Sequence, residues 1–176
     1  MKAVEFHGLD LRLALGLFIC WEGLHQLARR ACRTSKCAPI RETGATYLCS
    51  MLNALWCTFA GLYLSKAFLD MPDESRAQLD RDDPNSWAAV WVKGAAYGFL
   101  SWLAMDLLHC FEKYPHNVGL DALAHHGGFI FLTSMQMSYE IMPVVAAWLL
   151  LGELSTIPLN VRCLLYTSPS PRDGLL

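Results

Sequence analysis

Acidic and histidine side chains are paired twice within the apolar part of the sequence. Asp106 and His109 are three positions apart. Asp121 and His125 are four positions apart, so each pair can share one face of a helix. His126 follows His125 directly and would point about 100° away from it, so one of the two is expected to face inward while the other supports it or faces the headgroup boundary. A carboxylate beside an imidazole orients the ring and raises its basicity, as general acid–base chemistry requires.

Three kinds of chemistry fit these side chains, and a structural role is the alternative to all three. A histidine could act as a general base in acyl transfer, a histidine and a carboxylate could bind a metal, or the polar groups could hold a lipid headgroup. The structural alternative is a hydrogen-bonded cluster that joins helices. No HxxxH or HxxEH-like spacing presents two histidine ligands on one face, and the seven cysteines include no CxxC pair, so we predict no metal site.

The apolar residues gather in blocks about as long as a bilayer core is thick, which predicts an all-α, polytopic transmembrane helix bundle. Hydrophobic residues make up 54% of the 176 residues and charged residues 17%, against about 45–50% and about 25% in soluble domains. One bilayer span needs about 20 apolar residues. We predict spans at approximately 9–28, 47–68, 88–110 and 120–142, followed by a partial or bent span at 143–156, all within one domain covering 1–162.

The loops between these blocks predict which helix ends lie together. Short basic loops stay in the cytoplasm, and the loop after the first block contains Arg29, Arg30, Arg33, Lys36 and Arg41. Alternation places the turn after the third block on the same side. We therefore expect Asp106, His109 and His125 to approach one another there. If the fifth block crosses, Glu153 returns to this end, which makes Glu153 and Asp121 the candidate substrate-binding carboxylates.

The composition also bears on partners and on the first block. The formal net charge is -2, and no basic stripe is interleaved with aromatic residues, which excludes nucleic acid as a predicted partner. The predicted partners are membrane lipids, and the oligomeric state stays open. Asp10 and Arg12 interrupt the approach to the first apolar block, and no A-x-A-like cleavage site follows it, so we expect a retained span and no signal peptide.

The composition changes abruptly near the end of the chain. Residues 163–173 read CLLYTSPSPRD, which is rich in Ser and Pro and resembles a translated sequencing adapter. We expect 163–176 to be a non-native, disordered tail, with no packed element from about Tyr166 onward. The natural protein is then expected to continue differently after Arg162, which makes the bundle C-terminally truncated.

Short motifs in the second half of the chain resemble those of the TLC-domain family of multi-pass membrane lipid-handling proteins. They are DLLH at 106–109, KYP at 113–115, HH at 125–126, ELST at 153–156 and LNVR at 159–162. The first half is similar to the family only in its layout of helices and basic loop. The family includes the ceramide synthases, endoplasmic reticulum enzymes that join an acyl chain from acyl-CoA to a sphingoid amine. The resemblance implies that His125 and His126 match the paired active-site histidines of those enzymes.

The chain departs from the synthases after the histidine pair. Where the synthases carry a further His-Asp-rich segment, this chain reads GELST at 152–156, which is closer to the non-synthase branches. In those branches ELST is followed by Pro and an aromatic residue, whereas here Ile157 precedes Pro158. The resemblance to these branches implies a role in phospholipid composition, sphingolipid balance or protein trafficking.

These observations give one predicted function and two alternatives. We predict a protein that binds an acyl-chain lipid between its helices and contributes to membrane-lipid homeostasis, in the endoplasmic reticulum, with the plasma membrane as the alternative location. The first alternative is an acyl-CoA-dependent acyltransferase of the ceramide-synthase kind, with acyl-CoA as its substrate and no cofactor. The second is a non-enzymatic trafficking or lipid-sensing scaffold. For the acyltransferase, the candidate catalytic residues are His125, His126, Asp106 and His109.

Overall fold

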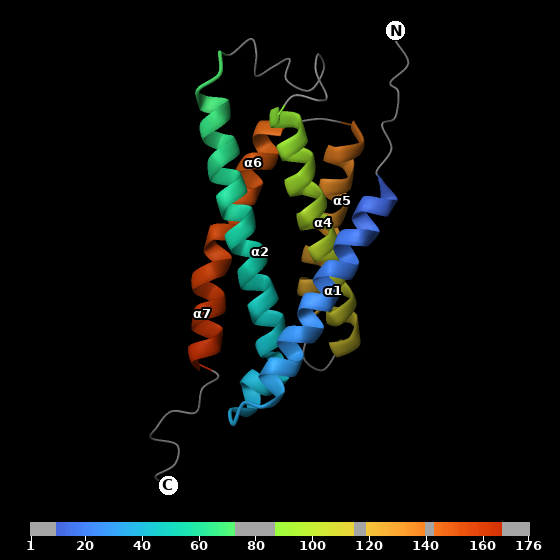
Figure 1. The fold of residues 1–176 in the computed structure, drawn as a ribbon, viewed down its shortest axis with the longest axis vertical. Helices are drawn as coiled ribbons and strands as arrows, with labels where there is room; N and C mark the ends of the chain where they lie inside the picture. Colours follow the sequence, from blue (N-terminus) through green and yellow to red (C-terminus); the bar gives the residue numbers. More distant parts are fainter. Residues whose placement is uncertain (1–9, 73–86, 115–118, 140–142, 167–176) are drawn as a thin grey trace.

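Every element of the described structure is helical (Figure 1). The structure is a computed structural model that describes residues 10–72, 87–114, 119–139 and 143–166. The elements are α1 (Leu11–Arg33), α2 (Ala38–Leu69), α4 (Trp87–Lys113), α5 (Leu120–Tyr139), α6 (Pro143–Gly152), the 3-10 turn η1 (Glu153–Ser155) and α7 (Thr156–Tyr166). The predicted all-α bundle is confirmed. A helix occupies the main part of each of the four predicted spans.

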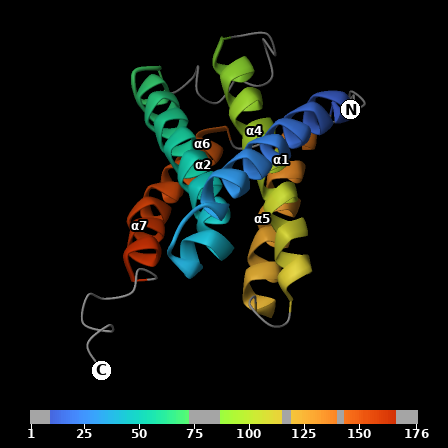
Figure 2. The same cartoon turned by 60° about the horizontal axis from the view of Figure 1, so that its bottom comes forward.

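Helix α2 is the centre of the bundle. It contacts α1, α4, α6 and α7, while α4 also packs against α1 and α5. The end of α1 and the start of α2 lie toward the same end of the molecule as the end of α4 and the start of α5 (Figures 1 and 2). This arrangement brings the basic α1–α2 connection to the end of the bundle that holds the predicted site.

Two side chain–backbone hydrogen bonds join α1 to α4. The Trp21 indole Nε1 donates to the carbonyl oxygen of Gly98 at 3.2 Å, and Ser101 Oγ donates to the carbonyl oxygen of Ala14 at 3.1 Å. These bonds attach the first half of α1 to the middle of α4.

Gly61 marks the closest approach between α2 and α6. A Cβ atom on Gly61 would lie 2.8 Å from the backbone nitrogen of Leu151 and 2.9 Å from the carbonyl oxygen of Ala147. Both distances are shorter than van der Waals contact and involve backbone atoms, so no side chain fits. The missing side chain lets the two backbones touch, and Ala147 is fully buried there.

The fifth predicted span continues beyond its expected end. The sequence predicts a partial or bent helix over 143–156. In the structure α6, η1 and α7 form one continuous, bent helical segment that runs along α2 to Tyr166 (Figure 1). Pro158 explains the interruption, because it has no N–H to donate to Leu154 and fits best in the first turn of a new helix. Asn160 Nδ2 donates to Ser50 Oγ at 2.9 Å and so attaches α7 to α2.

The described helix therefore includes the first four residues of the segment expected to be a tail. The rest of that segment, residues 167–176, lies outside the described residues, as does the expectation that it forms no packed element. Helix α7 passes Arg162 without a break, and the domain boundary at that residue stays a prediction.

Large apolar side chains cover much of the outer surface of the bundle. Exposed examples on four helices are Leu15, Ile19, Leu27, Leu55, Phe59, Leu62, Phe131, Leu132, Trp148 and Leu149. Extended apolar surfaces of this kind are rare on soluble monomers and are normal where helices face lipid. Among the described helices, the stretch Ile40–Leu69 has both the length and the apolar composition of a bilayer span. That α1, α4 and α5 also cross the bilayer stays a prediction.

Candidate functional site

A buried acid–histidine pair joins α4 to α5. His126 Nε2 lies 2.9 Å from Asp106 Oδ2, and the two side chains are 14% and 11% exposed. The other ring nitrogen of His126, Nδ1, lies 2.9 Å from the carbonyl oxygen of Ala122, one turn earlier on α5. The Trp102 ring lies beside the histidine, with 6.0 Å between ring centroids. The Cys110 thiol also lies 4.0 Å from Asp106 Oδ2, so the pair is buried between apolar and polar neighbours.

The contacts of His126 restrict its protonation. A carbonyl oxygen only accepts hydrogen bonds, so Nδ1 must carry a proton and donate it to Ala122. The contact between Nε2 and Asp106 then needs one further proton, held either by the ring or by the carboxyl group. With either location of that proton, neither nitrogen of His126 is free to accept a proton from a substrate in this conformation.

His125 points away from this pair. Its side chain is exposed, and its ring lies 4.8 Å from the Phe129 ring and 5.6 Å from the His126 ring. Within the described residues, neither His125 nor Asp121 forms a hydrogen bond, and Asp121 is exposed in the first turn of α5. The inward histidine of the two is therefore His126, and the expected approach of His125 to Asp106 does not occur.

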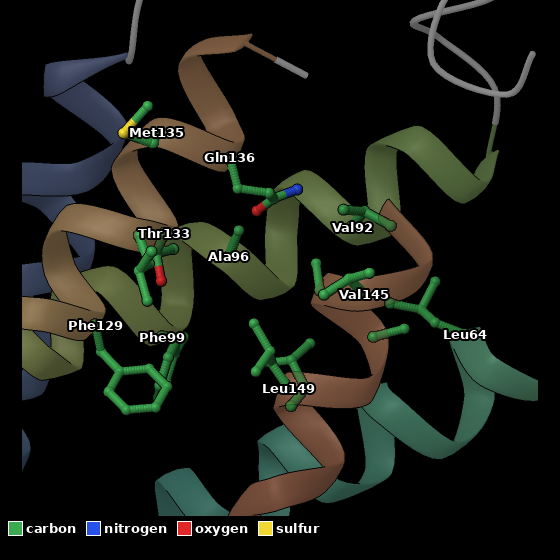
Figure 3. A pocket seen from close by; sticks show the side chains of 14 residues that line it. Leu64, Val92, Ala96, Phe99, Phe129, Thr133, Met135, Gln136, Val145 and Leu149 are labelled. Atoms are coloured by element: carbon green, nitrogen blue, oxygen red, sulfur yellow. The ribbon is translucent and has the colours of Figure 1, made fainter. Parts of the chain in front are cut away.

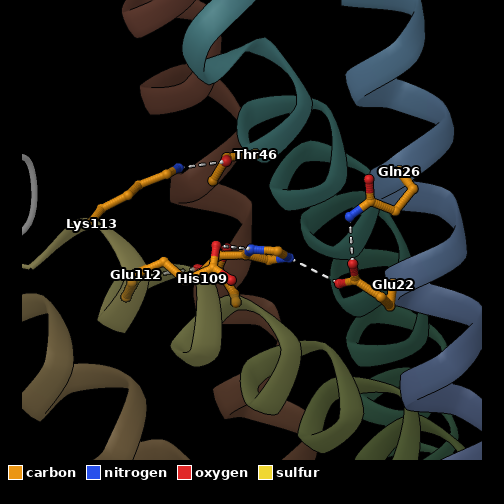
Figure 4. Close-up of polar contacts among 8 residues, drawn as sticks. Glu22, Gln26, Thr46, His109, Glu112 and Lys113 are labelled. Atoms are coloured by element: carbon orange, nitrogen blue, oxygen red, sulfur yellow. Dashed lines mark hydrogen bonds and ion pairs between the residues drawn. The ribbon is translucent and has the colours of Figure 1, made fainter.

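His109 turns toward α1 rather than α5. Its Nε2 lies 2.9 Å from Glu22 Oε2, and its Nδ1 lies 3.2 Å from Glu112 Oε2 (Figure 4). The amide of Gln26 donates to the second Glu22 oxygen at 2.7 Å. The His25 ring packs on His109 with centroids 4.1 Å apart. Asp106 and His109 thus share one side of α4 but bind partners on two different helices.

A polar cleft opens beside both acid–histidine contacts. It has a volume of about 710 Å³, and Asp106, His109 and Cys110 form one wall. The cationic side chains at its edge are Arg29, Arg33, Arg41 and Lys113. Lys113 reaches across from α4 to α2, where its Nζ donates to Thr46 Oγ1 at 3.0 Å (Figure 4). The cleft is therefore lined mainly by positive charge at the end where α1 meets α2.

An apolar cavity lies farther along α4. It encloses about 240 Å³ between α2, α4, α5 and α6, and its lining includes Leu64, Val92, Phe99, Phe129 and Leu149 (Figure 3). Phe99 stacks on Trp102, and Phe99 also meets Phe129 edge-on. Because Trp102 and Phe129 adjoin His126 and His125, this aromatic group separates the cavity from the histidines.

Glu153 lies at the junction between α6 and α7, beside α2, and not at the basic end of the bundle. It begins η1, between α6 and α7, and is half-buried. Its carboxylate lies close enough to interact electrostatically with the His126 ring. The sequence predicts Glu153 at the basic end because the fifth block is expected to end there, but the chain continues beyond it through the 11 residues of α7, about three further turns.

Two residues of the site, Glu22 and His25, were absent from the sequence-based candidates. They are three positions apart, the same spacing as Asp106 and His109, so the signal was present in the sequence. Both lie on α1, and only the crossing of α1 over α4 brings them to His109. Spacing within one helix cannot show that crossing.

A comparison with protein families identifies the fold. The family model described as the TLC domain matches residues 45–174, which is most of the chain. The chain belongs to the TLC-domain family. It is therefore a membrane protein of a lipid-related family, and the matched segment of the TLC domain contains Asp106, His109, His126 and Glu153 but not α1. No curated protein and no solved structure matches the chain.

Proposed function

We propose that this TLC-domain protein binds an acyl-chain lipid and contributes to membrane-lipid homeostasis, with the endoplasmic reticulum as its proposed location. The observation that carries the proposal is the apolar cavity of about 240 Å³ whose aromatic wall adjoins the buried Asp106–His126 pair. Ligand sites are typically apolar hollows with a few placed polar groups. The cavity takes the acyl chain, and the buried pair marks its polar end.

The polar cleft suits the headgroup of such a lipid. Asp106 lies seven positions after Phe99 on α4, so the cleft begins about 10 Å along the helix from the apolar cavity. Its four cationic side chains favour a headgroup that carries negative charge. A single lipid could then place its chain and its headgroup on opposite sides of the Asp106–His126 pair.

The proposal is tested by filling the apolar cavity with a larger side chain and measuring the lipid that remains bound to the protein. Ala146 is half-buried and lines the cavity, so Ala146→Phe places a ring in the space proposed for the acyl chain. Ala124→Phe, at an exposed position on α5, is the matched control. We expect lipid mass spectrometry of the purified proteins to show several-fold less bound lipid for Ala146→Phe and no loss for Ala124→Phe. Equal lipid content in both variants and wild type would contradict the proposal.

An acyl-CoA-dependent acyltransferase is the second candidate, and it would have to use His125. Its exposed ring has no hydrogen bond among the described residues, whereas both nitrogens of His126 and both of His109 are engaged. His125→Ala should then abolish transfer from labelled acyl-CoA at unchanged protein level, and His109→Ala should have a smaller or graded effect. Unchanged transfer and unchanged cellular lipids for His125→Ala would favour the scaffold alternative. The scaffold is also supported by His126 and His109, because both ring nitrogens of each already have partners.

A further inference from the structure

Three potential metal ligands from two helices meet between α1 and α4. One ligand atom from each of Glu22, His25 and His109 lies within 4.8 Å of the other two. Two imidazoles and one carboxylate are the ligand set of zinc sites that keep a fourth position for water or substrate. We propose that Glu22, His25 and His109 bind one divalent transition-metal ion of the zinc class. This inference goes beyond lipid binding, since none of the three residues lines the apolar cavity.

The buried ring of His25 has a nitrogen without a hydrogen-bond partner among the described residues. Its side chain belongs to a residue that is only 6% exposed, and its Nδ1 is buried with no hydrogen-bond partner among the described residues. Buried polar atoms are nearly always hydrogen-bonded or bound to an ion, because loss of water is otherwise uncompensated. A bond to a metal ion would satisfy a nitrogen of His25 without requiring another protein group to approach.

The contacts around His109 orient it as a ligand. Glu112 accepts a hydrogen bond from Nδ1, which leaves Nε2 as the nitrogen with a lone pair in the neutral ring. That lone pair faces the Glu22 carboxylate at 2.9 Å, so a proton or a cation must lie between them (Figure 4). A carboxylate on the far nitrogen of a ligand histidine is the usual outer contact of zinc sites, and Gln26 fixes Glu22 similarly.

Charge and access also suit a divalent ion. The carboxylates of Glu22 and Glu112 together balance two positive charges, and neutral imidazoles add none. Nitrogen ligands favour zinc-class ions over Ca²⁺ and Mg²⁺, which prefer oxygen. His109 also lines the polar cleft and is therefore reachable from water, although the four cationic side chains of the cleft oppose the approach of a cation. The site was not predicted because its two histidines lie on different helices, so no HxxxH-like spacing appears in the sequence.

The first experiment measures zinc in the full chain, purified with a tag that contains no histidine. After removal of metal and equilibration with Zn²⁺, we expect about one zinc ion per chain by mass spectrometry. At a zinc concentration one hundred times the Kd, we expect the thermal midpoint to rise by about 5–10 °C. Glu22→Gln and His25→Phe should each lose at least about tenfold in zinc affinity, and Glu112→Gln about 10–100-fold.

Two controls separate this site from other ligands. His125→Phe makes the same change as His25→Phe on an exposed histidine, and it should keep wild-type zinc content. Asp106→Asn disrupts the second group of possible ligands, Asp106, Cys110 and His126, and should also keep it. The proposal fails if wild type binds no zinc, or if Glu22→Gln and Glu112→Gln bind it as wild type does. These two nearly isosteric changes decide the question even if His25→Phe does not fold. Loss of zinc in Asp106→Asn alone would also overturn it.

Discussion

Two acid–histidine contacts of equal length join α4 to its neighbours in different surroundings. Asp106 and His126 meet at 2.9 Å with side chains 11% and 14% exposed, and both belong to the segment that matches the TLC domain. Glu22 and His109 also meet at 2.9 Å, but the Glu22 side chain is 33% exposed and precedes that segment. The inner pair is the less exposed of the two, while the outer one is in direct contact with a third charged side chain, Glu112. Equal distances therefore do not imply equal contributions to stability.

The inner pair should give the largest effect when one partner is removed. Asp106→Ala leaves His126 buried without its carboxylate, and breaking a buried ion pair in this way costs about 3–5 kcal/mol. We expect that loss in the free energy of unfolding, measured in detergent micelles of fixed composition. Because two apolar residues of similar size need no charge partner, Asp106→Leu combined with His126→Leu should recover most of it. A double variant as unstable as Asp106→Ala would show that the pair itself is not the cause.

The outer contact should respond less to the equivalent change. Glu22→Ala removes a partly exposed carboxylate, and His109 keeps Glu112 as a partner, so we expect a loss of about 1–2 kcal/mol without bound metal. Glu112→Ala is the comparison, since its side chain is 70% exposed and an exposed pair contributes about 0–1 kcal/mol. Both are measured by the same unfolding assay. A loss for Glu22→Ala equal to that for Asp106→Ala would remove the distinction between the two contacts.

The two contacts should also be independent of each other. Asp106 and His109 are only one turn apart on α4, but they bind partners on different helices and no hydrogen bond joins the two contacts, so we expect the effects of Asp106→Ala and Glu22→Ala to add to within about 0.5 kcal/mol. A double-mutant cycle on the unfolding free energies tests this. Strong coupling would instead indicate one continuous polar network across α1, α4 and α5.

The smallest effect on stability is expected at His125. Its exposed ring makes no hydrogen bond in the described part of the chain, so His125→Ala should change the unfolding free energy by less than about 0.5 kcal/mol. His126→Ala, one position later, serves as the contrast and should be strongly destabilising. If His125→Ala lowers stability as much as His126→Ala, the two histidines do not divide into an exposed one and a buried one.

The sequence could predict the helices but not the faces they present to each other. Apolar blocks of bilayer length located α1, α2, α4 and α5, because burial and length are properties of each block alone. Whether His125 or His126 faces inward depends on the rotation of α5 about its axis, and a change of one residue turns a side chain by about 100°. That rotation is set by packing against α4. The Asp106–His126 contact could therefore be expected only as one of two choices.

The contact between Glu22 and His109 shows a second limit of prediction from the sequence. Asp106 and His109 were expected to act together because their spacing places them on one side of α4. In the structure Asp106 contacts α5 and His109 contacts α1. This is possible because α4 lies between these two helices, so residues on one side of α4 can reach either neighbour. The sequence predicts a partial or bent span over 143–156, but the continuation of the chain as α7 depends on contacts such as Asn160 with Ser50.

The missing side chain at Gly61 determines which wall of the apolar cavity can move. Because the backbones of α2 and α6 touch at this residue, the two helices form one stiff side of the cavity. Helix α5, which forms the opposite side, makes few contacts with α6. A chain arriving sideways from the bilayer would therefore enter through the seam between α5 and α6, where the fewest contacts must separate. Gly61 therefore fixes α6 against α2 and leaves the contact of α5 with α6 as the weaker side of the cavity.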